Sequence, residues 1–169
     1  LLPNLTVYEN LYYYAKLRFP SKTRAELDAQ IELVLNDIGL AAKRDTKVGQ
    51  ATDKTLSGGE RKRLNIGMEL LVNAEIFILD EPTSGLSSKD SEKILDLLAN
   101  IAARGKIVLS VIHQPSSRLY KKFNKIILLD KGGRLAFRGS TFSALKYFKS
   151  HLEGLDQDDP VEVVCPHCR

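Results

Sequence analysis

Residues 76–112 have the sequence IFILDEPTSGLSSKDSEKILDLLANIAARGKIVLSVI, which contains the clearest structural pattern in the chain. Its two ends, 76–79 and 107–112, are short runs rich in Ile, Val and Leu, as is typical of strands buried on both faces of a parallel sheet. Between them, residues 88–103 place apolar side chains at spacings of three and four, which predicts a helix. Gly105 follows as the helix stop. The stretch therefore predicts a strand–helix–strand unit.

The sequence after this unit predicts a third strand and a hairpin. Residues 126–129 form another apolar run, which we expect to join the same parallel sheet. Gly132 and Gly133 mark a turn into a short strand that ends near Phe137. Ser140 then precedes a helical pattern and is expected to cap it.

The sequence before the unit predicts helices. Thr6 with Glu9, and Ser57 with Glu60, are capping-box pairs, in which a hydroxyl and a carboxylate each satisfy a free backbone amide at a helix start. Residues 24–38 carry an apolar stripe at helical spacing. We therefore expect the first half of the chain to be helical, with a polar loop between the second and third helices.

Composition and charge disfavour several classes of protein. The chain has 169 residues, of which 43% are hydrophobic and 27% charged, so it can bury a core as one domain or as a core with a satellite subdomain. Its longest apolar runs are far shorter than a membrane helix requires. The net charge of +4 gives little support for nucleic-acid binding. We interpret the basic triplet at 61–63 as a solvated helix face.

A glycine-rich helix start is the first candidate for chemistry. Ser57, Gly58, Gly59 and Glu60 follow Leu56. Glycines let a backbone approach a ligand closely, and the free amides and dipole of a helix N-terminus favour an anion such as phosphate. The alternative is an ordinary glycine-rich loop that only caps a helix.

Two further candidates follow the predicted strands. Asp80 and Glu81 come directly after the first apolar run, where open α/β sheets place their ligands. Adjacent strand residues point to opposite sides, so one carboxylate can face Mg²⁺ and the other an attacking water. His113 follows the second run and can donate a hydrogen bond to a phosphate. The alternatives are a solvated acidic turn and an ordinary surface or core histidine.

Together these motifs resemble those of ATP-binding-cassette (ABC) ATPases. LSGGERKRLNIGMELL at 56–71 resembles their signature helix, FILDEPTSGL at 77–86 their Walker B motif and D-loop, and SVIHQPS at 110–116 their switch-histidine segment. The segments LTVYENLYYYAKLR at 5–18 and GGRLAFRGS at 132–140 are similar to the G-type branch, which contains the white eye-pigment, sterol and multidrug half-transporters.

The resemblance implies a role for each matching position. The residues implied to contact the ATP of an opposing subunit lie at the signature helix start: Ser57, Gly58, Gly59 and Glu60. The residues implied to form the D-loop across a dimer interface are Ser84, Gly85 and Leu86. By the same resemblance Asp80 supports Mg²⁺, Glu81 polarises the attacking water and His113 senses the γ-phosphate. Ser87 stands where the family usually has an acid, which puts the usual D-loop contacts between subunits in question.

The sequence contains no G-x-x-x-x-G-K-[ST] motif, the P-loop that cradles nucleotide phosphates. The expected fold is therefore a partial α/β P-loop NTPase domain of the ABC type. We expect a helical subdomain at 1–73, the C-terminal half of the parallel-sheet core at 74–152, and a tail at 153–169. In that tail, the spacing of Cys165 and Cys168 could provide half of a zinc site, although an incidental tail is the simpler interpretation.

The resulting expectation is an ATPase that powers transport across a membrane in the full-length parent protein. Its partners would be a second nucleotide-binding domain and a transmembrane domain, with no nucleic acid, at the cytoplasmic face of the membrane. The chain by itself is expected to be soluble and inactive. The alternatives are a soluble ABC-type ATPase of DNA repair, chromosome structure or translation, and a non-catalytic interaction module.

Overall fold

The computed structural model describes residues 1–50, 55–113 and 115–151. The chain forms two compact units, Leu1–Gln114 and Pro115–Arg169, and each is described by itself. Within the described residues no helix combines the length and the apolar character needed to cross a membrane. Cys165 and Cys168, considered above as half of a zinc site, lie outside the described residues.

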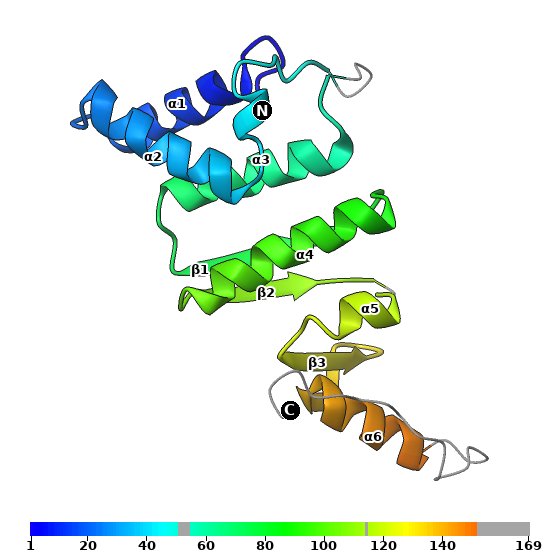
Figure 1. The fold of residues 1–169 in the computed structure, drawn as a ribbon. Helices are drawn as coiled ribbons and strands as arrows, with labels where there is room; N and C mark the ends of the chain where they lie inside the picture. Colours follow the sequence, from blue (N-terminus) through cyan, green and yellow to red (C-terminus); the bar gives the residue numbers. More distant parts are fainter. Residues whose placement is uncertain (51–54, 114, 152–169) are drawn as a thin grey trace, which may run out of the picture. The chain divides into compact units, whose positions relative to one another are not determined.

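The first unit begins with three packed helices. Helices α1 (Val7–Arg18), α2 (Arg24–Asp37) and α3 (Gly58–Leu71) contact one another in every pairing, and a short 3₁₀ turn, η1 (Ala41–Lys43), follows α2 (Figure 1). A Cβ placed on Gly67 would lie 2.8 Å from Cδ1 of Ile38, so this glycine allows α3 to approach the end of α2. The prediction of a helical first half is confirmed.

Side-chain capping begins all three helices. The predicted capping boxes of Thr6 with Glu9 and of Ser57 with Glu60 are both present. A third box that the sequence analysis did not use, Thr23 with Glu26, begins α2. Each box satisfies two backbone amides that have no partner inside the helix.

The predicted strand–helix–strand unit is also confirmed. Strands β1 (Ile76–Asp80) and β2 (Ile107–Val111) pair in parallel, from Ile76 opposite Ile107 to Asp80 opposite Val111. Helix α4 (Ser88–Ala103) connects them and packs on the sheet and on α3 (Figure 1). The two strands therefore end at the same edge, where Asp80 lies.

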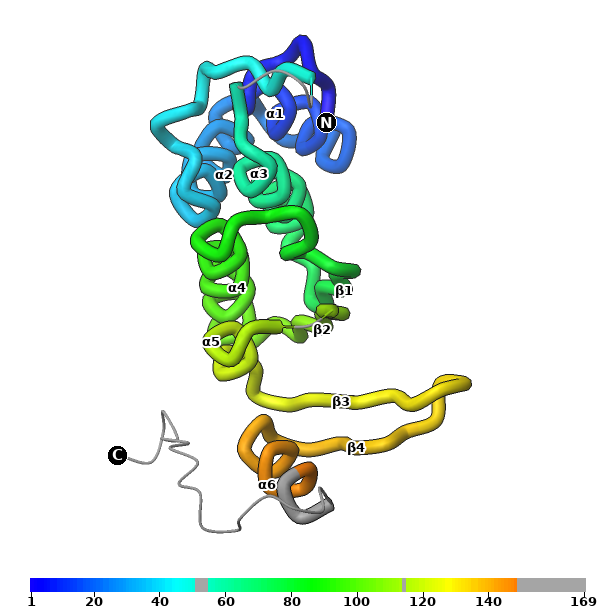
Figure 2. The backbone as a smooth tube through the Cα atoms, turned by 90° about the vertical axis from the view of Figure 1, so that its right-hand side faces the viewer, coloured from blue at the N-terminus to red at the C-terminus, as the bar shows by residue number. Residues whose placement is uncertain are grey.

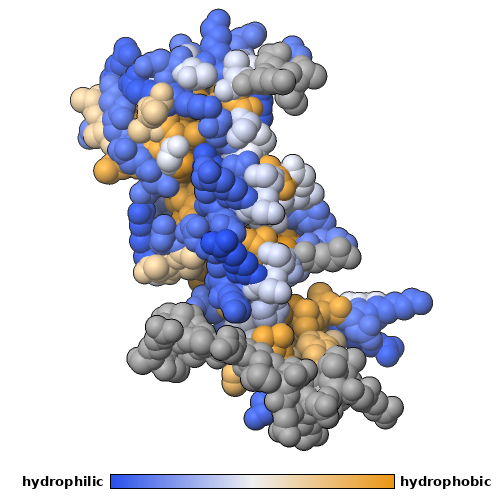
Figure 3. Space-filling model, turned by 45° about the vertical axis from the view of Figure 1, so that its right-hand side comes forward, coloured by the Kyte–Doolittle hydropathy of each residue, from blue (hydrophilic) through white to orange (hydrophobic). Residues whose placement is uncertain are grey.

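The expectation that these strands are buried on both faces was wrong. Phe77 is 6% exposed, whereas its neighbour Ile78 is 77% exposed. Burial alternates because successive strand residues point to opposite faces and α4 covers one face of β1 and β2. Apolar side chains therefore reach the surface, and hydrophobic areas are visible among hydrophilic ones in Figure 3.

The second unit contains a hairpin between two helices. Helix α5 (Ser117–Tyr120) precedes strands β3 (Lys125–Asp130) and β4 (Arg134–Ser140), and α6 (Thr141–His151) follows. Figure 2 shows the chain running out along β3 and returning along β4. The hydroxyl of Ser140 accepts a hydrogen bond from the backbone N–H of Ser143 at 3.0 Å, as its predicted capping role requires.

The expectation that the third apolar run joins the parallel sheet was wrong. In the described residues β3 pairs antiparallel with β4, as a two-stranded sheet separate from β1 and β2. Gly132 and Gly133 have φ of +80° and +75°, a left-handed backbone that reverses the chain within a tight turn. The turn places the next strand directly beside β3.

Candidate functional site

The start of α3 presents free backbone amides at an exposed position. Ser57 is the N-cap, with its hydroxyl accepting a hydrogen bond from the Glu60 amide at 3.2 Å. The Ser57 amide in turn donates to Oε2 of Glu60 at 2.8 Å. Ser57 and Gly58 are exposed, whereas Gly59 is buried. The helix start can therefore meet an anion through Ser57 and Gly58 more directly than through Gly59.

Gly59 at this helix start has a packing role that the sequence pattern does not indicate. A Cβ on Gly59 would lie 2.9 Å from both Cβ and Cγ of Asp90, in the first turn of α4. A Cβ on Gly58 would lie 3.3 Å from Cδ2 of Leu86. The absence of side chains lets the N-terminal ends of α3 and α4 meet. Contact of these glycines with a ligand remains a prediction.

A lysine from outside the motif holds the Glu60 carboxylate. The ammonium of Lys43, in η1, donates to Oε2 of Glu60 at 2.8 Å. Burial by itself raises the pKa of Glu60, but the hydrogen bonds from Lys43 and from the Ser57 amide bring that pKa below its ordinary value. Glu60 is thus an ionised part of the helix cap and is already occupied by protein donors.

The paired acids lie at the C-terminal end of β1. Asp80 is the last residue of the strand and is exposed. Glu81 lies beyond the strand with φ of +43°, and its N–H donates to the carbonyl of Val111 at 2.9 Å. The strand-alternation argument therefore does not apply to Glu81, because the left-handed backbone sets the direction of its side chain. A positive φ is uncommon for a residue with a Cβ.

The predicted D-loop residues form tight turns between β1 and α4. The amide of Ser84 donates to the Glu81 carbonyl at 3.1 Å, and the amide of Leu86 donates to the Thr83 carbonyl at 3.3 Å. Gly85 has φ of +71°, a conformation that glycine adopts without strain. The three predicted D-loop residues thus lie in two overlapping turns, and the carbonyl of Glu81 accepts the hydrogen bond that closes the first of them.

Ser87, which departs from the usual acid, is the N-cap of α4. Its hydroxyl accepts a hydrogen bond from the amide of Asp90 at 3.1 Å and lies 3.0 Å from Oδ2 of the same residue. Serine and aspartate are both good N-caps. The substitution therefore preserves what this position does for α4, whatever it does across an interface.

His113 follows β2 and is exposed. Because β1 and β2 are parallel and in register from Ile76 to Asp80, His113 lies beyond the same sheet edge as the paired acids. The part of the chain that the structure describes contains no group of three or more His, Cys, Asp and Glu residues able to hold a metal ion. A single carboxylate such as that of Asp80 is compatible with Mg²⁺ binding, since this ion commonly takes one or two carboxylates together with substrate phosphates.

The interpretation of residues 61–63 as a solvated helix face was wrong. Arg61 donates to backbone carbonyls of the segment 48–50. Arg63 is 7% exposed and donates to the Ile38 carbonyl at 2.9 Å. Lys62 also binds backbone carbonyls, in the turn after β1. A run of three basic residues faces three directions on a helix, so here each finds a different set of carbonyls.

Comparison with known proteins now gives the family. Residues 1–84 match the sequence profile of the family described as ABC transporter, and residues 113–161 match that described as ABC-2 type transporter. Residues 1–84 of the chain belong to the ABC transporter family. The α/β fold of the chain is accordingly that of a partial ABC-type P-loop NTPase domain.

Relatives of this chain come from the G family of ABC transporters. ABC transporter G family member 22 of Arabidopsis thaliana is 46% identical over 151 residues, which are 89% of this chain and 20% of that protein. The broad substrate specificity ATP-binding cassette transporter ABCG2 of Rattus norvegicus is 40% identical over 151 residues, 89% of this chain and 23% of its own length. The chain spans about a fifth of the length of these relatives.

The first unit contains every residue that the sequence predicts to act on the nucleotide. The helix start of α3 contacts the beginning of α4, and the strand ends of β1 and β2 lie at one sheet edge. The sequence does not indicate three side chains that lie between these parts: Lys43, Lys62 and Asp90. Their contacts join residues that are 17 or more positions apart or on different helices, and no local spacing indicates them.

Proposed function

We propose that this chain is part of a protein that hydrolyses ATP and uses that reaction to drive transport across a membrane. The observation that carries the proposal is the arrangement of the first unit, in which an exposed helix start and a strand end with paired acids are joined through one turn. The membership of the ABC transporter family supports it. The relatives named above are transporters by name.

In this proposal each residue has a distinct task. The α3 start, formed by Ser57, Gly58 and Gly59 with the Glu60 cap, binds the phosphates of an ATP that another subunit holds. Glu81 orients and polarises the attacking water, and His113 donates a hydrogen bond to the γ-phosphate. Asp80 would hold Mg²⁺, which neutralises the charge on the phosphate oxygens.

The proposal includes the partners and the organisation of the parent protein. A second nucleotide-binding domain would complete the site, with Ser84, Gly85 and Leu86 at the interface, and a transmembrane domain would receive the resulting motion. We propose a location at the cytoplasmic face of a membrane and no nucleic-acid partner. Within the chain we propose a helical subdomain at 1–73, the core portion at 74–152 and a tail at 153–169.

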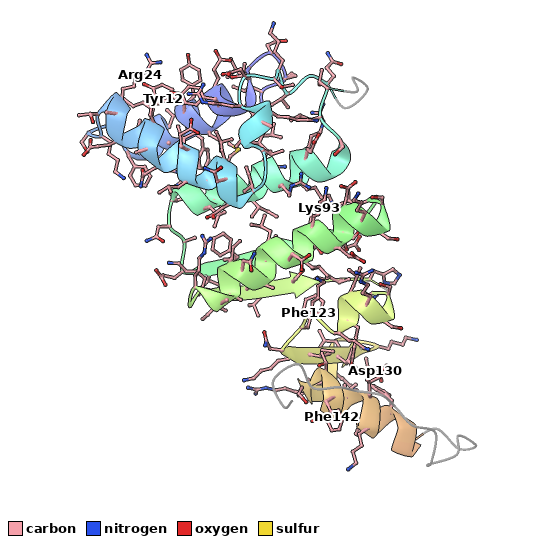
Figure 4. The ribbon with its side chains drawn as sticks, viewed as in Figure 1. Tyr12, Arg24, Lys93, Phe123, Asp130 and Phe142 are labelled. Carbon is pink, nitrogen blue, oxygen red and sulfur yellow. The ribbon has the colours of Figure 1, made fainter. Side chains whose placement is uncertain are left out.

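Glu81→Gln in the full-length parent tests the central assignment. The change preserves size and hydrogen bonding but removes the base, so steady-state ATP hydrolysis should fall by about a hundredfold or more while ATP still binds. Asp130→Asn is the matched control, because Asp130 is also an exposed acid at the end of an apolar strand (Figure 4). Its activity should equal that of the wild type.

Hydrolysis by Glu81→Gln near the wild-type rate would rule out Glu81 as the residue acting on water. A wild-type parent that binds ATP without hydrolysing it would instead favour a non-catalytic module. The transport part is tested separately, by reconstituting the parent in vesicles and asking whether substrate movement requires ATP.

A further inference from the structure

Lys62 makes a contact that the roles above do not use. It lies in the first half of α3, and its ammonium donates to the carbonyl of Glu81 at 2.9 Å and to that of Ser84 at 3.0 Å. One side chain therefore bridges the two ends of the turn that follows β1. The lysine as a whole is half-buried, whereas both hydrogen bonds of its ammonium are exposed to water.

The bridge fixes a residue with an unfavourable backbone. Glu81 has φ of +43°, which persists only where surrounding contacts determine it. Its N–H is held by the Val111 carbonyl of β2, and its carbonyl accepts from both Lys62 and the Ser84 amide. The peptide groups on both sides of the Glu81 Cα are thus anchored, one to the sheet and the other to α3.

We propose that Lys62 is a positioning residue for Glu81: it ties the helix whose start faces the nucleotide to the turn that carries the hydrolytic carboxylate. This inference rests on the proposed function. Without the lysine, the turn keeps the Ser84 hydrogen bond but loses both bonds to α3. Glu81 can then leave its left-handed conformation, and its carboxylate moves away from the attacking water.

A simpler role for Lys62 would be to stabilise the fold by satisfying two carbonyls. The two roles differ in their kinetic effect. Loss of a positioning residue lowers kcat at an unchanged KM for ATP, because the nucleotide contacts at Ser57 and Gly58 remain in place. A displacement of a catalytic group by about 1 Å can cost up to a hundredfold in rate.

The test uses the full-length parent with Lys62→Met, which keeps most of the aliphatic stem and removes every donor. We expect kcat for ATP hydrolysis to fall about tenfold or more, with KM within twofold of the wild type. Lys62→Arg should restore most of the rate, since a guanidinium can also donate to two carbonyls. Lys93→Met is the matched control, because Lys93 is exposed on α4 (Figure 4), and its kinetics should be unchanged.

Hydrogen exchange supplies a readout that does not depend on catalysis. In Lys62→Met the amides of Ser84 and Leu86 should exchange faster than in the wild type, while those of α2 should not change. Lys62→Gln serves as a second variant if the methionine variant does not fold.

Either of two results would overturn the inference: wild-type kcat in a folded Lys62 variant, or faster exchange without any loss of kcat. A wild-type parent without ATPase activity would overturn the proposed function itself, and the Lys62 inference with it. A loss of ATP binding equal to the loss of rate would assign Lys62 to the fold rather than to Glu81.

Discussion

Gly59 lies in a contact too close for any side chain. The Cβ of Asp90 would be 2.9 Å from a Cβ at this position, a separation that real Cβ atoms do not show. The neighbouring Gly58 differs, because its added Cβ would meet only the flexible end of Leu86, at 3.3 Å. The same sequence pair therefore contains one glycine that packing requires and one that packing tolerates replacing.

Gly59→Ala is expected to destabilise the chain by about 1–3 kcal/mol, since either α3 or α4 must shift to accept the methyl group. Gly58→Ala should cost less than about 1 kcal/mol, because Leu86 can move and alanine favours a helix. Urea unfolding followed by circular dichroism measures both. Equal effects of the two substitutions would contradict the packing role of Gly59.

Residue-level features were predictable where they depend on neighbours in the sequence. The capping boxes of Thr6 and Ser57 need only a hydroxyl and a carboxylate three residues later, and both are present as expected. The contacts of Lys62 were not predictable, because its partners lie 19 and 22 residues away. They lie in a turn whose conformation the sequence does not indicate. The direction of the Glu81 side chain was missed for a similar reason, since it depends on a positive φ.

At the scale of elements, an ion pair joins the C-terminal ends of α2 and α4. Arg104 donates two hydrogen bonds to the carboxylate of Asp37, at 2.5 and 2.7 Å. The hydrogen bonds from Arg104 lower the pKa of Asp37, outweighing the opposite effect of partial burial. A lowered folded-state pKa means that the pair contributes stability above the unfolded-state pKa of about 3.9, and that this contribution is lost as pH falls through the folded-state pKa.

Arg104→Met should therefore destabilise the chain near neutral pH and have no effect in strong acid. The side chains of Asp37 and Arg104 are 28% and 59% exposed, so the expected loss at pH 7 is only about 0.5–1 kcal/mol. Unfolding by urea at several pH values measures it, with Lys93→Met as the control on the same helix. A difference that persists unchanged at pH 2 would assign the effect to packing by the arginine stem.

Elements with a local sequence pattern were predicted correctly, whereas the pairing of β3 was not. The bounds of α4 match the predicted 88–103 because its apolar spacing, serine cap and final glycine agree. The apolar run in β3 resembles those in β1 and β2, yet it pairs antiparallel with β4. An apolar run predicts a strand, whereas the partner is set by the glycine turn that follows it.

At the scale of the molecule, one face of the first unit's sheet has exposed apolar side chains among the described residues. Its side chains are between 50% and 77% exposed: Ile76, Ile78, Ile107, Leu109 and Val111. Parallel sheets are normally covered on both faces, which is why their strands have nearly continuous apolar sequences. The strands of this chain have that sequence, and the relatives are about five times as long as the matching segment.

The lack of a P-loop motif in the sequence limits how tightly the chain alone can bind ATP. A P-loop makes several charge-assisted hydrogen bonds to phosphate, each contributing roughly 1.5–3 kcal/mol, and the 169-residue sequence contains no G-x-x-x-x-G-K-[ST] motif. Loss of three or four such bonds removes about 5–10 kcal/mol, whereas micromolar binding requires only about 8 kcal/mol. The exposed Ser57 hydroxyl and Gly58 amide should therefore give no better than millimolar affinity. Titration calorimetry of the chain with ATP and Mg²⁺ measures this directly. A dissociation constant in the low micromolar range would show that the residues present hold the nucleotide in a way that needs no P-loop.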